Sequence, residues 1–269
     1  MMLRTLKLTG RCYQHVPSDN PRLCEEQVEL EADKTTLVVM HVWNVACPGG
    51  PPYDPTHAVG FAFPFAFAEA YRICKEIIRP AVDASREAGI LVSHATTTKI
   101  AMKRPEARID HDASEPLQTP LPPDPGAAPG HRRQIIHDRF GDPSKSAYET
   151  MDRLDFLMPQ GDEPFIYQTN QFHRQLGRRG IQNIIYTGFA TDRCILRAGG
   201  GAIPMAQLGY RIFIVREATL GQEYHDTFEQ RLNTHYGIRE VEALLGQSIA
   251  IDDYLANCQR LTPQRHGPG

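Results

Sequence analysis

The sequence predicts an α/β protein with a doubly wound, mostly parallel β-sheet and helices on both faces. Short, continuous apolar runs alternate along its 269 residues with segments of helical spacing. Such runs are typical of parallel strands that are buried on both faces, and their alternation with helices is typical of β-α-β units. A chain of this length can bury the core of one large α/β domain with extensions.

The composition excludes several classes of function. A formal net charge of -3 provides no basic surface for nucleic acid. No apolar run is long enough to span a bilayer, and the first ten residues lack the apolar core of a signal peptide. We therefore expect a soluble cytoplasmic protein with no nucleic-acid or membrane partner. Its cysteines are scattered without a C-x-x-C pair, which indicates reduced thiols: Cys12, Cys24, Cys47, Cys74, Cys194 and Cys258.

The N-terminal part combines a predicted extension with the first core strand. Residues 1–34 alternate apolar and polar pieces around a proline-rich turn, which predicts a β-hairpin-like extension. Residues 36–44 are mostly apolar and predict a buried strand that opens the α/β domain, expected to cover residues 35–258 before a flexible tail at 259–269. His41 and Asn44 lie at the end of this strand, where ligands bind in open α/β sheets.

The next elements are a helix, a strand and a long loop. Helical spacing predicts a helix over residues 68–88, kinked at Pro80 and capped by Gly89. Residues 90–94 predict the second core strand, which ends at His94. The loop 95–130 is rich in proline, and a loop of this length is a lid, a partner-binding arm or a partly mobile segment.

The alternation of strands and helices continues to the C-terminus. Three consecutive glycines, Gly199 to Gly201, predict a break in one helix, with a second helical piece starting at Pro204. The predicted strands cover residues 133–136, 165–167, 184–186, 211–215 and 248–251, and the predicted helical stretches cover the approach to residue 157, residues 170–179, residues 225–236 and the segment from residue 252.

Residues 183–196 predict a strand–turn–helix that presents a cysteine. Gly188 permits a sharp turn after the strand, and Thr191 or Asp192 is expected to cap the helix that follows. Cys194 then falls in the first helical turn, where unpaired N–H groups and the helix dipole favour a thiolate, so we expect a lowered pKa. The same N–H groups are candidates for an oxyanion site. The alternative is that Cys194 is a small buried apolar residue.

The stretch 187–194, Thr-Gly-Phe-Ala-Thr-Asp-Arg-Cys, with the following strand to residue 215, resembles the nucleophile region of the isochorismatase-like cysteine hydrolase superfamily. Residues 36–44 resemble its first strand, and the resemblance covers about residues 35–255. It implies a parallel sheet flanked by helices, dimeric or tetrameric assembly, and a cysteine that attacks amide-type C–N bonds with help from an aspartate and a lysine. It also implies a cis peptide between Phe189 and Ala190.

The sequence departs from this family at two positions. His41 stands where the family has its aspartate, and the stretch 161–164 holds no lysine at the family's position. Lys145, in Lys-Ser-Ala-Tyr, imitates the lysine motif with altered spacing, and Lys99 or Lys103 from the long loop are alternatives. A neutral imidazole can accept a thiol proton at neutral pH, so a Cys–His pair remains chemically competent.

We therefore predict a cysteine hydrolase that acts on an amide-type C–N bond of a small molecule and uses no cofactor. The alternative is a catalytically degenerate relative that binds a small molecule or a partner. Asp54 and His57 are metal-type ligands without an evident third partner, so no metal is expected. The expected catalytic residues are Cys194 as nucleophile, His41 as base, Asn44 and Lys145, and the expected substrate contacts are Trp43, Phe189, Ala190, Arg193 and His94.

Overall fold

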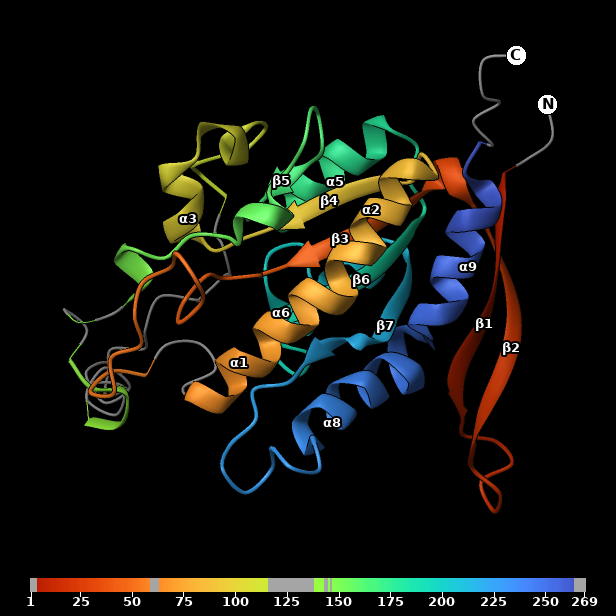
Figure 1. The fold of residues 1–269 in the computed structure, drawn as a ribbon. Coiled ribbons are helices and arrows are strands. Elements are labelled where there is room, and N and C mark those ends of the chain that lie inside the picture. The colour runs from red at the N-terminus through yellow and green to blue at the C-terminus, as the bar shows by residue number, and fades with distance from the viewer. Residues whose placement is uncertain (1–3, 59–62, 116–137, 143–144, 146, 264–269) are drawn as a thin grey trace, which may run out of the picture.

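The computed structural model describes residues 4–58, 63–115, 138–142, 145 and 147–263 (Figure 1). Within them lies an eight-stranded sheet of order β2-β1-β8-β7-β6-β3-β4-β5. Strands β3 to β8 pair in parallel, and the antiparallel hairpin β1–β2 joins them through β8. The strands are β1 Thr5–Gln14, β2 Arg22–Glu31, β3 Thr35–Met40, β4 Leu91–Ala95, β5 Phe165–Ile166, β6 Asn183–Phe189, β7 Arg211–Leu220 and β8 Gly246–Ile249.

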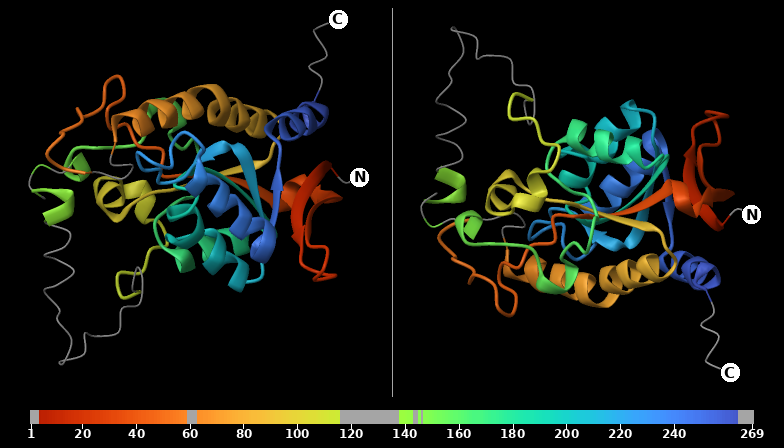
Figure 2. Two further views of the ribbon diagram at one scale, coloured as in Figure 1. Left: turned by 90° about the horizontal axis from the view of Figure 1, so that it is seen from below. Right: turned by 90° about the horizontal axis from the view of Figure 1, so that it is seen from above.

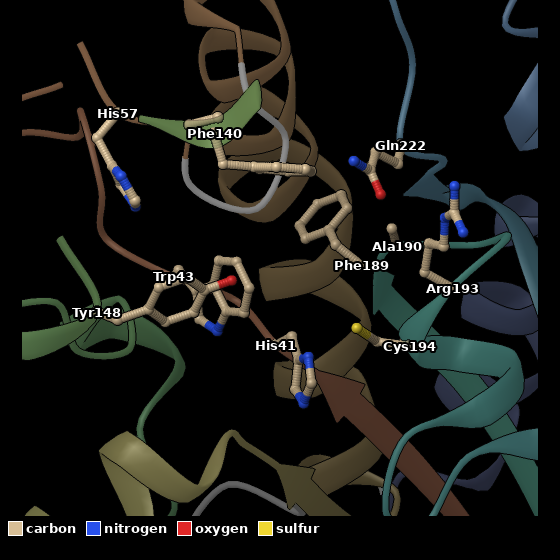
Figure 3. A pocket seen from close by; sticks show the side chains of 11 residues that line it. His41, Trp43, His57, Phe140, Tyr148, Phe189, Ala190, Arg193, Cys194 and Gln222 are labelled. Atoms are coloured by element: carbon tan, nitrogen blue, oxygen red, sulfur yellow. The ribbon is translucent and has the colours of Figure 1, made fainter. Parts of the chain in front are cut away.

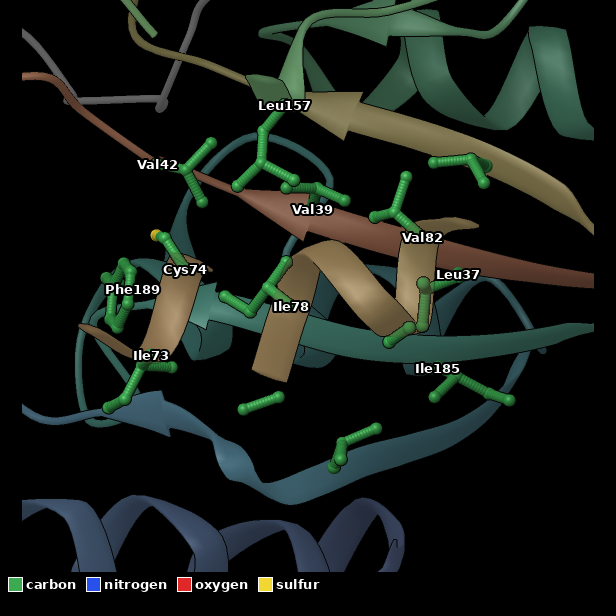
Figure 4. Packing of buried hydrophobic residues seen from close by; sticks show 14 of the residues in the cluster. Leu37, Val39, Val42, Ile73, Cys74, Ile78, Val82, Leu157, Ile185 and Phe189 are labelled. Carbon is green, nitrogen blue, oxygen red and sulfur yellow. The ribbon is translucent and has the colours of Figure 1, made fainter. Parts of the chain in front are cut away.

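Helices cover both faces of this sheet (Figure 2), so the predicted fold class is confirmed. Alternate side chains of the fully buried β3 enter two separate apolar clusters. Leu37 and Val39 pack toward α1, α2 and α9 (Figure 4), whereas Val38 and Met40 pack toward α5, α6 and α7. The helices are α1 Pro64–Ile73, α2 Arg79–Glu87, α3 Thr98–Lys103, α5 Thr169–Arg178, α6 Cys194–Arg197, α7 Ala202–Gln207, α8 Leu232–Glu240 and α9 Ile251–Leu261.

The N-terminal hairpin predicted from the sequence is present and shares the core. Leu6, Leu8 and Leu30 are fully buried in the same cluster as Tyr254 and Cys258 of α9. Fully burying a leucine contributes about 1.5–3 kcal/mol, so the hairpin contributes to the stability of the sheet that it extends. No helix in the described part of the chain is long and apolar enough to cross a membrane.

The helix predicted over residues 68–88 begins earlier in the structure and is interrupted by a π-helical turn instead of a kink at Pro80. It starts at Pro64, and a π-helical turn, Cys74–Ile78, separates α1 from α2. The two helices continue as one rod in Figure 1. Pro80 lies in the first turn of α2, where the hydrogen-bonding pattern changes and its missing N–H matters least.

Other predictions are corrected by the structure. Part of the long loop is helical, as α3 and the 3-10 turn Pro105–Arg108, while residues 116–130 and the predicted strand 133–136 lie outside the described residues. The stretch up to residue 157 forms two short 3-10 turns, Ala147–Glu149 and Asp155–Leu157, instead of a helix.

The helix predicted over residues 225–236 starts only at Leu232. The buried carboxylate of Glu223 accepts hydrogen bonds from the Asn233 and Thr234 N–H groups and fixes the start of α8 there. Arg231, just before it, has a left-handed backbone with φ 51°. A carboxylate from the loop before the helix therefore sets this boundary, which helical spacing alone does not reveal.

Candidate active site

The candidate site lies where the strand order reverses. From β3 the chain continues to β4 on one side, and from β6 it continues to β7 on the other. The crevice at the carboxyl ends of two such strands is where ligands bind in doubly wound sheets. Met40 at the end of β3 is paired with Gly188 in β6, so His41 and the Phe189–Ala190 segment emerge side by side.

A cavity of about 360 Å³ opens at this edge of the sheet, a size suited to a small molecule. Most of its wall is apolar and aromatic, and Figure 3 shows His41, which follows β3, and Cys194, which begins α6, beside it. Its lining residues are His41, Trp43, His57, Ala58, Phe140, Tyr148, Phe189, Ala190, Arg193, Cys194 and Gln222. The sequence prediction included six of these as site residues: His41, Trp43, Phe189, Ala190, Arg193 and Cys194. It did not include His57, Ala58, Phe140, Tyr148 and Gln222 as contacts.

His41 is a buried histidine held in an uncommon backbone conformation. Its φ is 46°, its N–H donates to the Ala95 carbonyl at 3.1 Å, and its side chain is 5% exposed. The ring stacks on Trp43 with centroids 5.6 Å apart, and neither ring nitrogen has a hydrogen-bond partner among the described residues. Burial, and then the charge of Arg153, lower the pKa of His41 to about 4, so its imidazole is neutral at pH 7.

Cys194 is the first residue of α6, as the sequence predicted, but its electrostatics differ from the prediction. Helix α6 has only four residues, so it offers little dipole. Burial raises the pKa of the Cys194 thiol, and Asp192 adds to this, while the Ala190 N–H, which points to the sulfur, and Arg193 oppose it. The expected lowering of the pKa is therefore wrong, because desolvation outweighs a one-turn helix.

In the turn between β6 and Cys194, backbone N–H groups bond to a carbonyl of the same turn. The Phe189–Ala190 peptide is cis, as the family resemblance implied. The Arg193 and Ile195 N–H groups both donate to the Ala190 carbonyl, at 3.1 and 3.0 Å. These two donors are occupied, so the Ala190 N–H is the better candidate to meet an oxyanion beside the sulfur.

Thr191 or Asp192 was expected to cap the helix, but neither does so. The Thr191 hydroxyl pairs with that of Thr219 at 2.6 Å, and the Asp192 carboxylate accepts the Gln222 N–H at 2.7 Å. Both side chains fasten the turn to the end of β7. Arg193 stands in the capping position instead, pairs with Asp192 at 3.3 Å, and lies on the same side of the cavity as Gln222 (Figure 3).

Asn44 is bonded to the backbone of a distant segment and is not among the cavity residues. Its Oδ1 accepts the Asp152 N–H at 2.8 Å, and its own N–H donates to the Asp152 carbonyl at 3.0 Å. The structure therefore does not bring it to the His41 ring as an orienting group. It closes the loop after β3 instead.

Asn44→Ala is expected to lower the free energy of unfolding by about 1–2 kcal/mol, because it leaves the Asp152 N–H without its acceptor. Urea denaturation of both proteins measures this. Asn170→Ala is the matched control, since that side chain is exposed on α5. Equal stability of the two variants would mean that the Asn44 side chain carries no structural role.

The candidate lysines lie away from the cavity lining. Lys145 is exposed and lies 3.4 Å from the Thr56 hydroxyl. Lys99 pairs with Glu149, and Lys103 donates to the carbonyls of Glu149 and Met151. Among the residues that the structure describes, no lysine lines the cavity.

His94 is buried behind the site instead of contacting a substrate. Its Nδ1 lies 2.8 Å from an Arg153 Nη2 atom, and its Nε2 lies 2.9 Å from a Glu163 carboxylate oxygen. An arginine can only donate, so Nδ1 accepts and Nε2–H donates to Glu163. Burial lowers the pKa of His94 to about 4, which keeps the ring neutral. The sequence contains no signal that singles out Arg153 as its partner.

Asp54 and His57, the two possible metal ligands in the loop after β3, make different contacts. Asp54 accepts hydrogen bonds from the Thr56 N–H and hydroxyl, whereas His57 turns into the cavity. Within the described ranges, no group of three or more histidine, cysteine or acidic side chains is arranged to hold a metal ion.

Neither protein-family models nor curated proteins match the sequence, whereas solved structures match the fold. A cysteine hydrolase from Pseudomonas syringae pv. phaseolicola 1448A has 12% identity and a TM-score of 0.52, with 86% of this chain and 95% of that chain covered. An isochorismatase family protein from Burkholderia thailandensis has 17% identity and a TM-score of 0.46, with 84% and 96% covered. An isochorismatase-like hydrolase from Alkaliphilus metalliredigens has 15% identity and a TM-score of 0.47, with 83% and 98% covered. The first of these confirms the architecture of the sheet and its helices.

Proposed function

We propose that this chain is a cysteine hydrolase that cleaves an amide-type C–N bond of a small molecule through a covalent Cys194 intermediate. The observation that supports it most is that the Cys194 sulfur and the buried His41 ring, which has no hydrogen-bond partner among the described residues, line one cavity at the reversal point of the sheet. The Pseudomonas syringae protein of the same fold is described as a cysteine hydrolase, which agrees with this proposal.

The proposed reaction begins with a neutral thiol and a neutral imidazole. As the Cys194 sulfur attacks the amide carbon, its proton passes to a His41 ring nitrogen, and the carbonyl oxygen becomes an oxyanion beside the Ala190 N–H. The His41 imidazolium then gives the proton to the leaving nitrogen, the C–N bond breaks, and a thioester remains. A water molecule, deprotonated by His41, hydrolyses the thioester and restores the thiol.

The proton transfer is expected to occur only when a substrate is bound. A resting thiolate–imidazolium pair needs a thiol of low pKa next to an imidazole of higher pKa. Here the pKa of Cys194 is raised and the pKa of His41 is lowered to about 4, both chiefly by burial. The free protein therefore holds both groups uncharged at pH 7.

We expect Cys194 to react slowly with iodoacetamide at pH 7 and increasingly fast as the pH rises above 9, because only the thiolate is alkylated. Peptide mass spectrometry measures the rate at each cysteine, and the partly exposed Cys24 is the internal reference. A rate at Cys194 that is fast and independent of pH from 6 to 8 would show a preformed ion pair and contradict the neutral pair proposed here.

The hydrolase is tested by measuring ammonia release from a panel of small primary amides and ureas, with an acid quench to trap the thioester for mass measurement. We expect one or more substrates to be turned over, with kcat/KM constant above about pH 5 and falling near pH 4 as His41 becomes protonated. His41→Asn is expected to reduce kcat by about 10²–10⁴-fold, as for loss of a general base. An active His41→Asn variant would contradict the assignment of the base.

The alternative function is binding without catalysis. It is favoured by the raised pKa of Cys194 and by the absence of a lysine or carboxylate among the described cavity residues. Trp43, the only tryptophan of the chain, lines the cavity and reports binding through its fluorescence. Panel members that change this emission without releasing ammonia or forming a thioester would support the binding protein.

A further inference from the structure

Arg153 is a buried arginine behind the cavity that lacks an ion-pair partner within the described residues. Its side chain is 0% exposed, and its guanidinium lies over the Phe165 ring at 5.4 Å. It donates to the carbonyls of Ala95 at 2.9 Å and Leu157 at 3.2 Å, while its Nε has no partner in the described part of the chain. Burying a charge in this way is costly unless neighbouring groups compensate for it.

The groups behind Arg153 do not compensate its charge. Arg86 and Glu163 form a bidentate ion pair with both distances at 2.8 Å, so they neutralise each other. His94 lies between Glu163 and Arg153, and it is neutral because it accepts from the arginine and donates to the carboxylate. Asp152 also attracts Arg153, but its carboxylate is paired with Arg104. One net positive charge therefore remains in this cluster. Burial lowers the pKa of Arg153 to about 9, which still leaves it protonated at pH 7.

Arg153 is connected to His41 through a shared backbone carbonyl and through pairing of the segments next to both residues. The Ala95 carbonyl accepts both the Arg153 guanidinium and the His41 N–H, at 2.9 and 3.1 Å. Arg153 is also paired with Trp43 as in an antiparallel ladder, and the Leu154 N–H donates to the Val42 carbonyl at 3.0 Å. The arginine and its neighbour thus brace the turn in which His41 takes its left-handed conformation, which costs energy for a residue with a side chain.

We propose that Arg153 is a positioning residue: it braces the turn that carries His41 and places a fixed positive charge behind the imidazole ring. Its catalytic consequence rests on the hydrolysis proposed above. A nearby cation disfavours the imidazolium, so the resting His41 ring is neutral and, once protonated in the reaction, it is a stronger acid that returns its proton readily to the leaving nitrogen. The titratable groups placed around the ring are Arg153 behind it and, on the cavity, Cys194, His57, Tyr148 and Arg193.

The charge is tested by titrating His41 in the absence of any substrate. A protonated imidazole quenches a stacked indole, so the emission of Trp43 follows the charge of His41, and the His41 Cε1–H signal in NMR spectra gives the same midpoint independently. The variants are Arg153→Gln, which keeps amide donors without the charge, and Arg153→Lys, which keeps the charge without the planar group. Arg22→Gln is the control, because it removes one positive charge from an exposed residue on the distant hairpin strand β2.

We expect the His41 midpoint, near pH 4 in the unmodified chain, to move upward in Arg153→Gln and to stay near its original value in Arg153→Lys and Arg22→Gln. An unchanged midpoint in Arg153→Gln, or an equal shift in the glutamine and lysine variants, would overturn the role of the charge. If Arg153→Gln does not fold, an upward shift in Arg153→Lys alone overturns it. None of these readouts needs turnover, so failure of the proposed hydrolysis is recognised separately.

Discussion

Cys194→Ala is expected to abolish turnover while the fold stays intact. Loss of a covalent nucleophile reduces kcat on the order of 10³-fold or more. The side chain is half-buried at the edge of the second apolar cluster, so removal of one sulfur should lower the free energy of unfolding by about 1 kcal/mol at most. Ammonia release, the mass of the quenched protein and urea denaturation measure the three effects.

Cys24→Ala serves as the matched control for this substitution, because Cys24 lies on the distant hairpin strand β2. It should retain full activity and the mass of the trapped thioester. If Cys194→Ala remains active on a substrate of the unmodified chain, then the covalent mechanism is wrong, and water or the substrate itself must supply the nucleophile.

Gly188→Ala is expected to have the largest effect on stability. Gly188 has φ 102°, and a Cβ atom at this position would lie 2.0 Å from the Met40 carbonyl oxygen. Because both atoms belong to paired central strands, relief of this contact requires β3 and β6 to separate just before His41. We expect the free energy of unfolding to fall by roughly 3–5 kcal/mol, as for the most damaging single substitutions. Urea denaturation measures this loss.

Gly180→Ala separates backbone strain from the close contact. Gly180 also has a positive φ, 67°, but a Cβ atom there would meet nothing within 4 Å. The cost of a left-handed conformation alone is about 1–2 kcal/mol. Equal destabilisation by the two substitutions would show that the approach of Gly188 to Met40 is looser than this structure has it.

The fold class was predictable because its determinants are local. A strand buried on both faces needs an unbroken apolar run, and β3, β6 and β7 each contain one. Boundaries were less predictable where side-chain caps and changes in the helical hydrogen-bonding pattern set them. The carboxylate of Glu223 fixes the start of α8, and the π-helical turn before Pro80 replaces a simple kink.

The placement of His41 and Cys194 on one cavity was also predictable, since the carboxyl ends of parallel strands share one edge of the sheet. The roles expected for Asn44 and His94 were not supported. Both residues also lie at the carboxyl ends of strands, but their side chains bond other partners. Asn44 bonds the backbone of Asp152, and His94 bonds Arg153. Sequence position gives the edge on which a side chain lies, and packing decides which way it points.

The sequence by itself determined the parallel sheet, the strand–turn–helix that carries Cys194, and the histidine that lines the same cavity. Only the tertiary structure decided the charge states of that pair. Helix position alone suggested a lowered pKa for Cys194, whereas burial raises it. The physical reason is that burial arises from residues far apart in the chain. At Cys194 it outweighs the dipole of a four-residue helix, and at His41 it acts together with the charge of Arg153.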